Sequence, residues 1–253
     1  MDLGDKAMHR LSCSEIWGGN REIDADICAG PLMASVFSRG VNGGRGGDIY
    51  YFSVCGRNNV ARIALADVVG HGQAVSQTGQ WLYDAMSLRM NEMVGRAILG
   101  DLNKLAKARG RRLITTAEVI TFDKGDFKLH FAYAGHPPLL IKRQDQPGWR
   151  IVSLKTPSPT GDIPLGILEN VQYDEEFIHL KSGDALFLYT DGVIEAVGKD
   201  GQRFGVKRLL EVLGNQPINQ PIGLKQAVLD ELIRFTDGNF QHDDMTLMAI
   251  RIS

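Results

Sequence analysis

The sequence contains few of the residues that define several large classes of protein. Cysteine occurs three times in 253 residues, at Cys13, Cys28 and Cys55, which is too few for a disulfide framework or a thiolate metal site. Reduced thiols in a cytosol fit this count best. No stretch reaches the roughly 18 consecutive apolar residues of a membrane span, and residues 1–10 lack the apolar run of a signal peptide. We therefore expect a cytoplasmic protein that does not enter a membrane.

Positive charge is not in excess either. The chain has 28 Lys and Arg against 30 Asp and Glu, which gives a formal net charge of −2. Proteins that bind nucleic acid usually carry a basic surface that neutralises the phosphate backbone. The composition therefore argues against a nucleic-acid partner and against a metal-dependent nuclease. With 43% hydrophobic and 23% charged residues, the chain is instead expected to fold as an ordinary globular protein.

Runs of β-branched and aromatic residues predict strands that follow one another as hairpins. Residues 49–55 and 60–68 flank a turn at 57–59, and residues 114–122 and 127–133 flank a turn at 123–126. Further predicted strands cover 139–142, 149–154, 171–180, 185–189 and 245–252.

Four segments have the apolar spacing of helices instead. Val75, Leu82, Met86 and Met93 recur at offsets of 7, 4 and 7, which predicts a helix from residue 73 to about residue 94. Other predicted helices cover 97–109, 205–213 and 223–235. Consecutive hairpins with paired helices predict the α+β class, in which antiparallel sheets carry helices on their outer faces. We expect residues 1–253 to form a single domain.

Four aspartates lie at the edges of predicted strands, each with glycine or another aspartate close by in the sequence: Asp48, Asp67, Asp191 and Asp243. Taken singly, such an aspartate is more often a turn or cap residue than a ligand. The hairpin, however, places Asp48 at the start of one strand and Asp67 near the end of its partner, so the two can face one another. Asp191 and Asp243 would meet in the same way if their strands are antiparallel neighbours.

Carboxylates brought together in this way repel one another unless a proton or a cation intervenes. Hard oxygen ligands select Mg²⁺ or Mn²⁺ over softer metals. A centre with two divalent cations would resolve the repulsion. It would also lower the pKa of bound water enough to make hydroxide near neutral pH, and would neutralise charge on a phosphoryl group.

Five segments together carry a resemblance to a known family. They are 46–48 (Gly-Gly-Asp), 67–72, 133–139, 186–193 and 243–246. In this order they resemble the PPM family of metal-dependent serine/threonine phosphatases, in its bacterial SpoIIE-like or RsbU-like branch, over roughly residues 40–252. The resemblance implies an αββα sandwich, two antiparallel β-sheets flanked by α-helices, with Mn²⁺ or Mg²⁺ at one end.

The resemblance also implies roles for individual residues. Asp67 is similar to the carboxylate that bridges both metals, with the backbone carbonyl of Val68 as a neighbouring ligand. Asp191 and Asp243 resemble the ligands that complete one metal, and Asp48 resembles the carboxylate on the other side. Metal-bound hydroxide would then attack phosphorus directly, without a phospho-enzyme.

Some residues near these positions are expected to assist. Asp244 and Gly47 would lie next to the ligands, and Arg45 either donates to a substrate phosphate or is a solvated loop charge. Branch members usually carry a second acidic residue three positions after Asp48. Tyr51 replaces it here, which leaves the geometry around the metals open.

Two histidines lie within the matched segments, and a third directly precedes one. His71 and His136 lie beside glycine, and we expect structural roles for both because oxygen-rich Mg²⁺ or Mn²⁺ sites need no imidazole. His242 precedes Asp243, and it is either a surface residue or an influence on protonation of the leaving group.

By resemblance, the expected function is hydrolysis of phosphoserine or phosphothreonine in a protein. The implied substrate is a STAS-domain anti-sigma-factor antagonist in a partner-switching circuit, with regulation by a separate sensor chain. The alternative is a catalytically silent phosphoprotein-binding regulator with the same fold. Retention of all four aspartates favours the enzyme, because a silent homologue has no chemical need to keep them.

Overall fold

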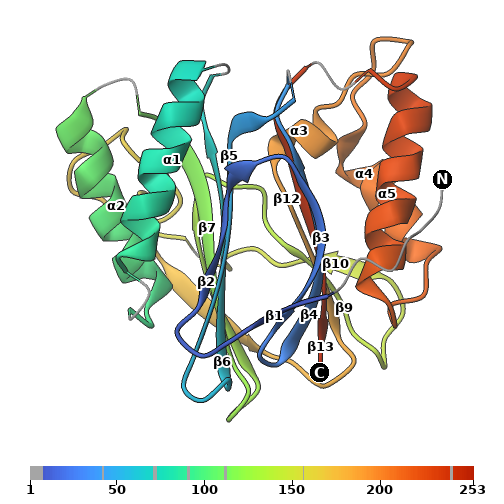
Figure 1. Cartoon of the computed structure of the whole chain (residues 1–253), viewed down its shortest axis with the longest axis horizontal. Helices are drawn as coiled ribbons and strands as arrows, with labels where there is room; N and C mark the ends of the chain where they lie inside the picture. The colour runs from blue at the N-terminus through green and yellow to red at the C-terminus, as the bar shows by residue number, and fades with distance from the viewer. Residues whose placement is uncertain are drawn as a thin grey trace.

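Two β-sheets pack face to face, and helices cover their outer surfaces (Figure 1). The computed structural model describes residues 8–41, 43–70, 73–89, 92–110, 113–155, 157–239 and 242–253. The predicted α+β class and the predicted sandwich of two sheets between helices are confirmed.

Sheet A has seven strands, and its neighbours are antiparallel except for the parallel pair β1 and β3. Its centre is formed by β4 and β13, which lie far apart in the sequence. In spatial order the strands are β1 (His9–Leu11), β3 (Ile23–Ala29), β4 (Leu32–Arg39), β13 (Met245–Ile252), β12 (Ala185–Tyr189), β9 (Leu140–Lys142) and β10 (Trp149–Ile151).

Sheet B has six strands, all paired antiparallel with their neighbours. In spatial order they are β11 (Glu175–His179), β8 (Lys128–Ala134), β7 (Thr115–Asp123), β6 (Val60–Val68), β5 (Arg45–Cys55) and β2 (Ile16–Arg21). Strand β5 buries both of its faces: Tyr50 and Phe52 lie in the core between the sheets, whereas Ile49 and Tyr51 pack beneath helices. A strand buried on both faces has a nearly continuous apolar sequence.

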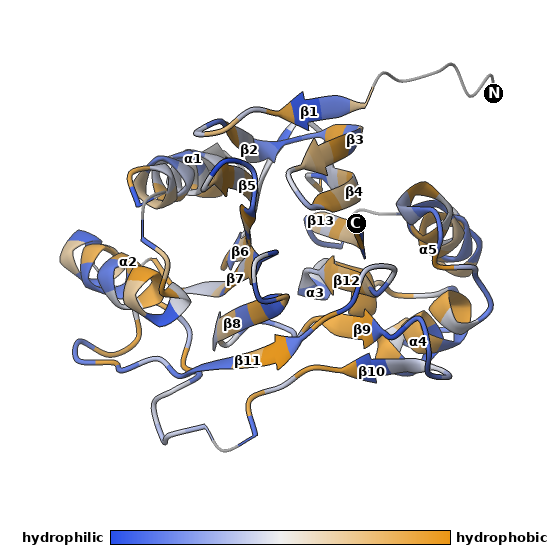
Figure 2. Ribbon diagram, turned by 90° about the horizontal axis from the view of Figure 1, so that it is seen from below, coloured by the Kyte–Doolittle hydropathy of each residue, from blue (hydrophilic) through white to orange (hydrophobic). Residues whose placement is uncertain are grey.

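The helices form the two outer layers, as the view in Figure 2 shows. Helices α1 (Gln73–Ser87) and α2 (Gly95–Arg109) cover sheet B. Helices α3 (Asp191–Ile194), α4 (Gly205–Gly214) and α5 (Pro221–Thr236) lie on the side of sheet A. Among the described residues, no helix combines the length and the apolar character needed to cross a membrane.

The structure corrects the ends of four predicted elements by three residues or more. The strand expected from residue 49 begins at Arg45. The helix expected to reach residue 94 ends at Ser87. Met93 fits the apolar spacing but lies beyond the helix and is 41% exposed, and its sulfur contacts the Arg62 guanidinium. The strand expected over 171–180 begins only at Glu175, since the Asp174 carboxylate is bonded to the N–H and hydroxyl of Ser158. The strand expected over 149–154 ends at Ile151.

The N-terminal strands β1 to β4 had no counterpart in the prediction. Strand β2 contains Gly18 and Gly19, and β3 alternates apolar residues with Asp24 and Asp26, so neither shows a strong apolar run. Strands β3 and β4 form a local hairpin, and β4 pairs on its other side with β13, which is distant in sequence.

Candidate active site

Strands β5 and β6 bring Asp48 and Asp67 together at one end of sheet B. Ile49 pairs with Ala66, so the next position along the ladder places Asp48 opposite Asp67. Both side chains are on the inner face of the sheet, because residues alternate along a strand. Asp48 is 2% exposed and Asp67 is 8% exposed. The predicted meeting of these two carboxylates within one hairpin is confirmed.

Sheet A contributes Asp191 and Asp243 at the same end of the sandwich, beside α3 in Figure 1. Strands β12 and β13 are antiparallel neighbours, as expected, with Tyr189 paired to Leu247. Asp191 begins α3 directly after β12, and Asp243 precedes β13. The carboxyl group of Asp67 lies within hydrogen-bonding reach of that of Asp191. Four carboxylates from four segments therefore share one region.

Burial and mutual repulsion disfavour negative charge in this cluster. Burial, reinforced by Asp191, Asp243 and Asp244, raises the pKa of Asp67 to about 8. Burial also raises the pKa of Asp243, to about 6, and burial with the charge of Asp67 raises the pKa of Asp48. Such shifts show that the protein does not itself supply the positive charge that ionised carboxylates need.

The cluster also has unused ligand atoms. Asp48 Oδ1 and Asp191 Oδ1 are buried and have no hydrogen-bond partner. Among the residues that the structure describes, no three His, Cys, Asp or Glu side chains are arranged so that they could already hold a metal ion between them. The donor set, which is made of oxygen atoms alone, fits Mg²⁺ or Mn²⁺, and the side chains would have to close around such an ion.

Thr190 connects the two sheets at this point. Its hydroxyl donates to Asp48 Oδ2 at 2.8 Å and accepts from the N–H of Thr246 at 2.9 Å. The Ser38 and Thr246 hydroxyls share a further hydrogen bond at 2.8 Å. Thr190 was not among the residues predicted from the sequence, although its place between β12 and Asp191 was a usable signal.

Asp244 holds the turn that precedes Asp48. Its carboxylate accepts from the N–H groups of Val41 at 2.8 Å and Gly47 at 2.5 Å. A Cβ atom at Gly46 would lie 2.7 Å from this carboxylate, closer than real contacts allow. The structure therefore places Asp244 and Gly47 next to Asp48.

Arg45 and Tyr51 lie away from the carboxylates. The Arg45 guanidinium donates to the Gln80 side chain on α1 at 2.9 Å, so its described contact gives no support to a role in phosphate binding. Tyr51 is on the opposite face of β5 from Asp48 and packs near the Tyr83 ring, with 6.3 Å between ring centroids. The missing acidic residue at position 51 therefore does not disturb the cluster.

The histidines differ in their surroundings. His136 is buried within the sandwich, as expected of a structural residue, whereas His242 is exposed. His71 lies outside the described residues.

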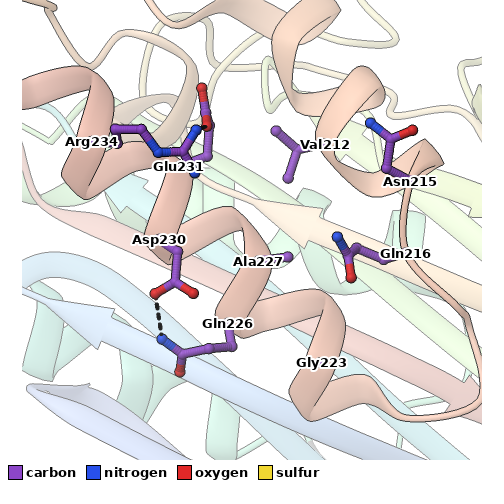
Figure 3. A pocket seen from close by; sticks show the side chains of 9 residues that line it. All are labelled: Val212, Asn215, Gln216, Gly223, Gln226, Ala227, Asp230, Glu231 and Arg234. Carbon is purple, nitrogen blue, oxygen red and sulfur yellow. Dashed lines mark hydrogen bonds and ion pairs between the residues drawn. The ribbon is translucent and has the colours of Figure 1, made fainter.

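A pocket of about 560 Å³ lies elsewhere, between α4 and α5 (Figure 3). Its polar and charged side chains already pair among themselves: the Gln226 amide donates to Asp230, and Arg234 pairs with Glu231. It contains none of the four aspartates, so we place the chemistry at the carboxylate cluster.

Comparison with known proteins gives a consistent result. The family model described as stage II sporulation protein E (SpoIIE) matches residues 57–253. Phosphoserine phosphatase RsbU of Bacillus subtilis is 26% identical over 210 residues, which cover 81% of this chain and 59% of RsbU. Five curated relatives are each matched over 19% to 59% of their length, so the chain spans less than two thirds of any of them.

Two solved structures share the fold. The structure of the RsbU and RsbW domains of Rv1364c from Mycobacterium tuberculosis has a TM-score of 0.73 at 25% identity, covering 90% of this chain and 62% of that one. The catalytic domain of the serine threonine protein phosphatase PstP, solved in complex with two manganese ions, has a TM-score of 0.58 at 18% identity. That likeness covers 87% of this chain and 98% of that one.

Proposed function

The chain belongs to the SpoIIE family, and on that premise we propose that it is a metal-dependent phosphoserine/phosphothreonine protein phosphatase. The observation that carries the proposal is the convergence of Asp48, Asp67, Asp191 and Asp243 from both sheets on one end of the sandwich. Turn formation or helix capping alone would not require these four residues to meet.

We assign each carboxylate a role toward two divalent cations, Mn²⁺ or Mg²⁺. Asp67 would bridge them, with the carbonyl of Val68 beside it; Asp191 and Asp243 would complete one site, and Asp48 would hold the other. The ions would supply Lewis-acid chemistry, namely activation of water and neutralisation of charge on the phosphoryl group. The chain itself orients the ligands: Thr190 fixes Asp48, and Asp244 fixes the turn before it.

The proposed substrate is a phosphorylated STAS-domain anti-sigma-factor antagonist in the cytoplasm, with regulation by a separate sensor chain. Support comes from the family and from the similarity to RsbU. The described cysteines are all free, and the sequence has no motif for an activated thiolate, so a covalent cysteine intermediate has no place in the proposal.

The test is hydrolysis of p-nitrophenyl phosphate and of a phosphoserine protein, with and without Mn²⁺. We expect EDTA to abolish turnover and iodoacetamide to leave it largely intact. Asp67→Asn should retain less than about a tenth of wild-type turnover, because tenfold is only about 1.4 kcal/mol of barrier, too little for a bridging ligand. Asp101→Asn, an exposed change on α2, is the matched control. A folded wild-type protein that binds phosphoprotein without turnover would indicate the silent regulator instead.

A further inference from the structure

Glu118 is an acidic residue in the core between the sheets. It lies on β7, paired with Leu65 of β6 and with Tyr133 of β8. The residue is 0% exposed, and neither carboxyl oxygen has a hydrogen-bond partner. An isolated carboxylate at such a place would cost several kcal/mol, so Glu118 needs either a proton or a charged neighbour.

His136 is the group that faces it. The imidazole Nε2 lies 4.0 Å from Glu118 Oε1, and both side chains are completely buried. Nε2 makes no hydrogen bond, although the backbone of Tyr189 also lies close enough to the ring to act on its pKa. The nearby Tyr133 hydroxyl is already used, since it donates to the carbonyl of Val152 at 2.5 Å. Burial raises the pKa of Glu118 and lowers that of His136 to about 3. A protonated acid facing a neutral imidazole satisfies both tendencies.

Such a pair determines which imidazole nitrogen carries the hydrogen. If the Glu118 carboxyl donates to Nε2, the hydrogen of His136 must be on Nδ1. Nδ1 lies 3.0 Å from the Thr116 hydroxyl, which then accepts from it. A contact of 4.0 Å would have to shorten by about 1 Å to become a full hydrogen bond.

Thr116 connects the Glu118 and His136 pair to the carboxylate cluster. It pairs directly with Asp67 across β6 and β7. Because Thr116 and Glu118 are two positions apart on one strand, both side chains are on the inner face. Glu118, His136 and Thr116 thus form a continuous row from the core to the carboxylate assigned as bridging.

We propose that Glu118 is a positioning residue that sets the tautomer of His136, and that His136 in turn fixes Thr116 beside Asp67. The inference rests on the proposed function only in its consequence for catalysis. Removing a residue that orients a metal ligand typically lowers metal affinity or activity by about 10- to 100-fold.

The first test compares Glu118→Gln with Glu118→Leu. The glutamine amide still donates to Nε2, so we expect the Nδ1–H tautomer in ¹⁵N NMR of the His136 ring and Mn²⁺ affinity within about threefold of wild type. The leucine removes the donor. We expect the Nε2–H form to appear, Mn²⁺ affinity to fall about tenfold and kcat to fall with little change in KM. An unchanged tautomer and unchanged Mn²⁺ affinity in Glu118→Leu would overturn the proposal.

A second pair of variants leaves Glu118 and His136 untouched and keeps the idea testable if Glu118→Leu does not fold. Thr116→Val removes the hydroxyl and should weaken Mn²⁺ binding about tenfold, whereas Thr116→Ser should restore it. Thr121→Val, a buried threonine on the same strand but the opposite face, is the control. Equal Mn²⁺ affinities in all three would refute the link to Asp67. Tautomer and Mn²⁺ titration need no turnover, so they are informative even if the protein is not a phosphatase.

Discussion

At Gly192 the backbone of α3 passes so close to the start of β13 that a Cβ atom would collide with the carbonyl oxygen of Asp244 and come within 3.5 Å of Asp243 Cβ. Glycine is therefore required at this position by the approach of two backbones. Any side chain would displace either Asp191 or Asp243, because the two residues flank the contact.

We predict that Gly192→Ala lowers the free energy of unfolding by about 1–3 kcal/mol, the usual cost of overpacking, and weakens Mn²⁺ binding. Urea unfolding and Mn²⁺ titration measure the two effects. Gly223→Ala is the control, since a Cβ atom there meets nothing within 4 Å, and alanine in a helix is more favourable by up to about 1 kcal/mol. Equal urea midpoints for the two variants would contradict this account of Gly192.

At the scale of elements, the contact between β12 and β5 depends on Thr190, whose hydroxyl is bonded to both Asp48 and the Thr246 N–H. We predict that Thr190→Val lowers the free energy of unfolding by about 1–3 kcal/mol, the cost of leaving buried polar groups unpaired, and weakens metal binding. Thr190→Ser should recover both properties.

The control for this prediction is Thr236→Val. Thr236 is also a buried threonine with a hydrogen-bonded hydroxyl, but it lies at the end of α5 and bonds within its own helix, to the Leu232 carbonyl. If Thr190→Val and Thr236→Val bind Mn²⁺ equally well, the connection through Thr190 does not orient Asp48.

Local sequence pattern predicted the central strands well. The observed bounds of β6, β12 and β13 coincide with the predicted 60–68, 185–189 and 245–252, because strands inside a sheet carry apolar residues on both faces. Strands β2 and β3 carry no such signal: β2 is held by pairing with β5, and β3, although it forms a local hairpin with β4, alternates apolar with acidic residues.

As with the strands, the candidate site was predictable from the sequence only where the residues that meet are close together in the chain. Asp48 and Asp67 could be paired from one hairpin, whose register is local. Thr190 and Glu118 could not be identified in this way, since their partners come from elsewhere in the chain: Thr190 is 142 residues from Asp48. Nothing in the strand containing Glu118 indicated that His136 would face it from the segment after β8.

At the scale of the whole molecule, the carboxylate cluster should make stability depend on pH in the opposite direction from an ordinary salt-bridged protein. The pKa of Asp67 is raised to about 8 in the folded state, against about 3.9 in an unfolded chain. The folded state therefore holds a proton that the unfolded state releases, and stability present below pH 4 is lost as pH rises through 8.

We predict that, in EDTA, the free energy of unfolding falls by at least about 1–2 kcal/mol between pH 6.5 and pH 8, which is one proton's contribution over that range. The raised pKa values of the buried Asp48 and Glu118 act in the same direction. This window avoids the opposite effect of His136, whose lowered pKa reduces stability only below about pH 6.5. Urea unfolding at the two pH values is the measurement. Asp67→Asn should reduce the slope; a wild-type slope in that variant would show that the raised pKa belongs elsewhere.

The position of β4 and β5 has a consequence for how the protein could be divided. Strand β4 lies between β3 and β13, and β5 lies between β2 and β6, whereas the segment matched by the family model starts at residue 57. A fragment cut there would expose the long edges of β13 and β6, and unpaired edges of this kind are templates for association with other chains. It would also lack Asp48. A boundary drawn from sequence similarity would thus pass through both sheets and yield an aggregation-prone piece, because residues 8–56 complete the structure that the matched segment begins.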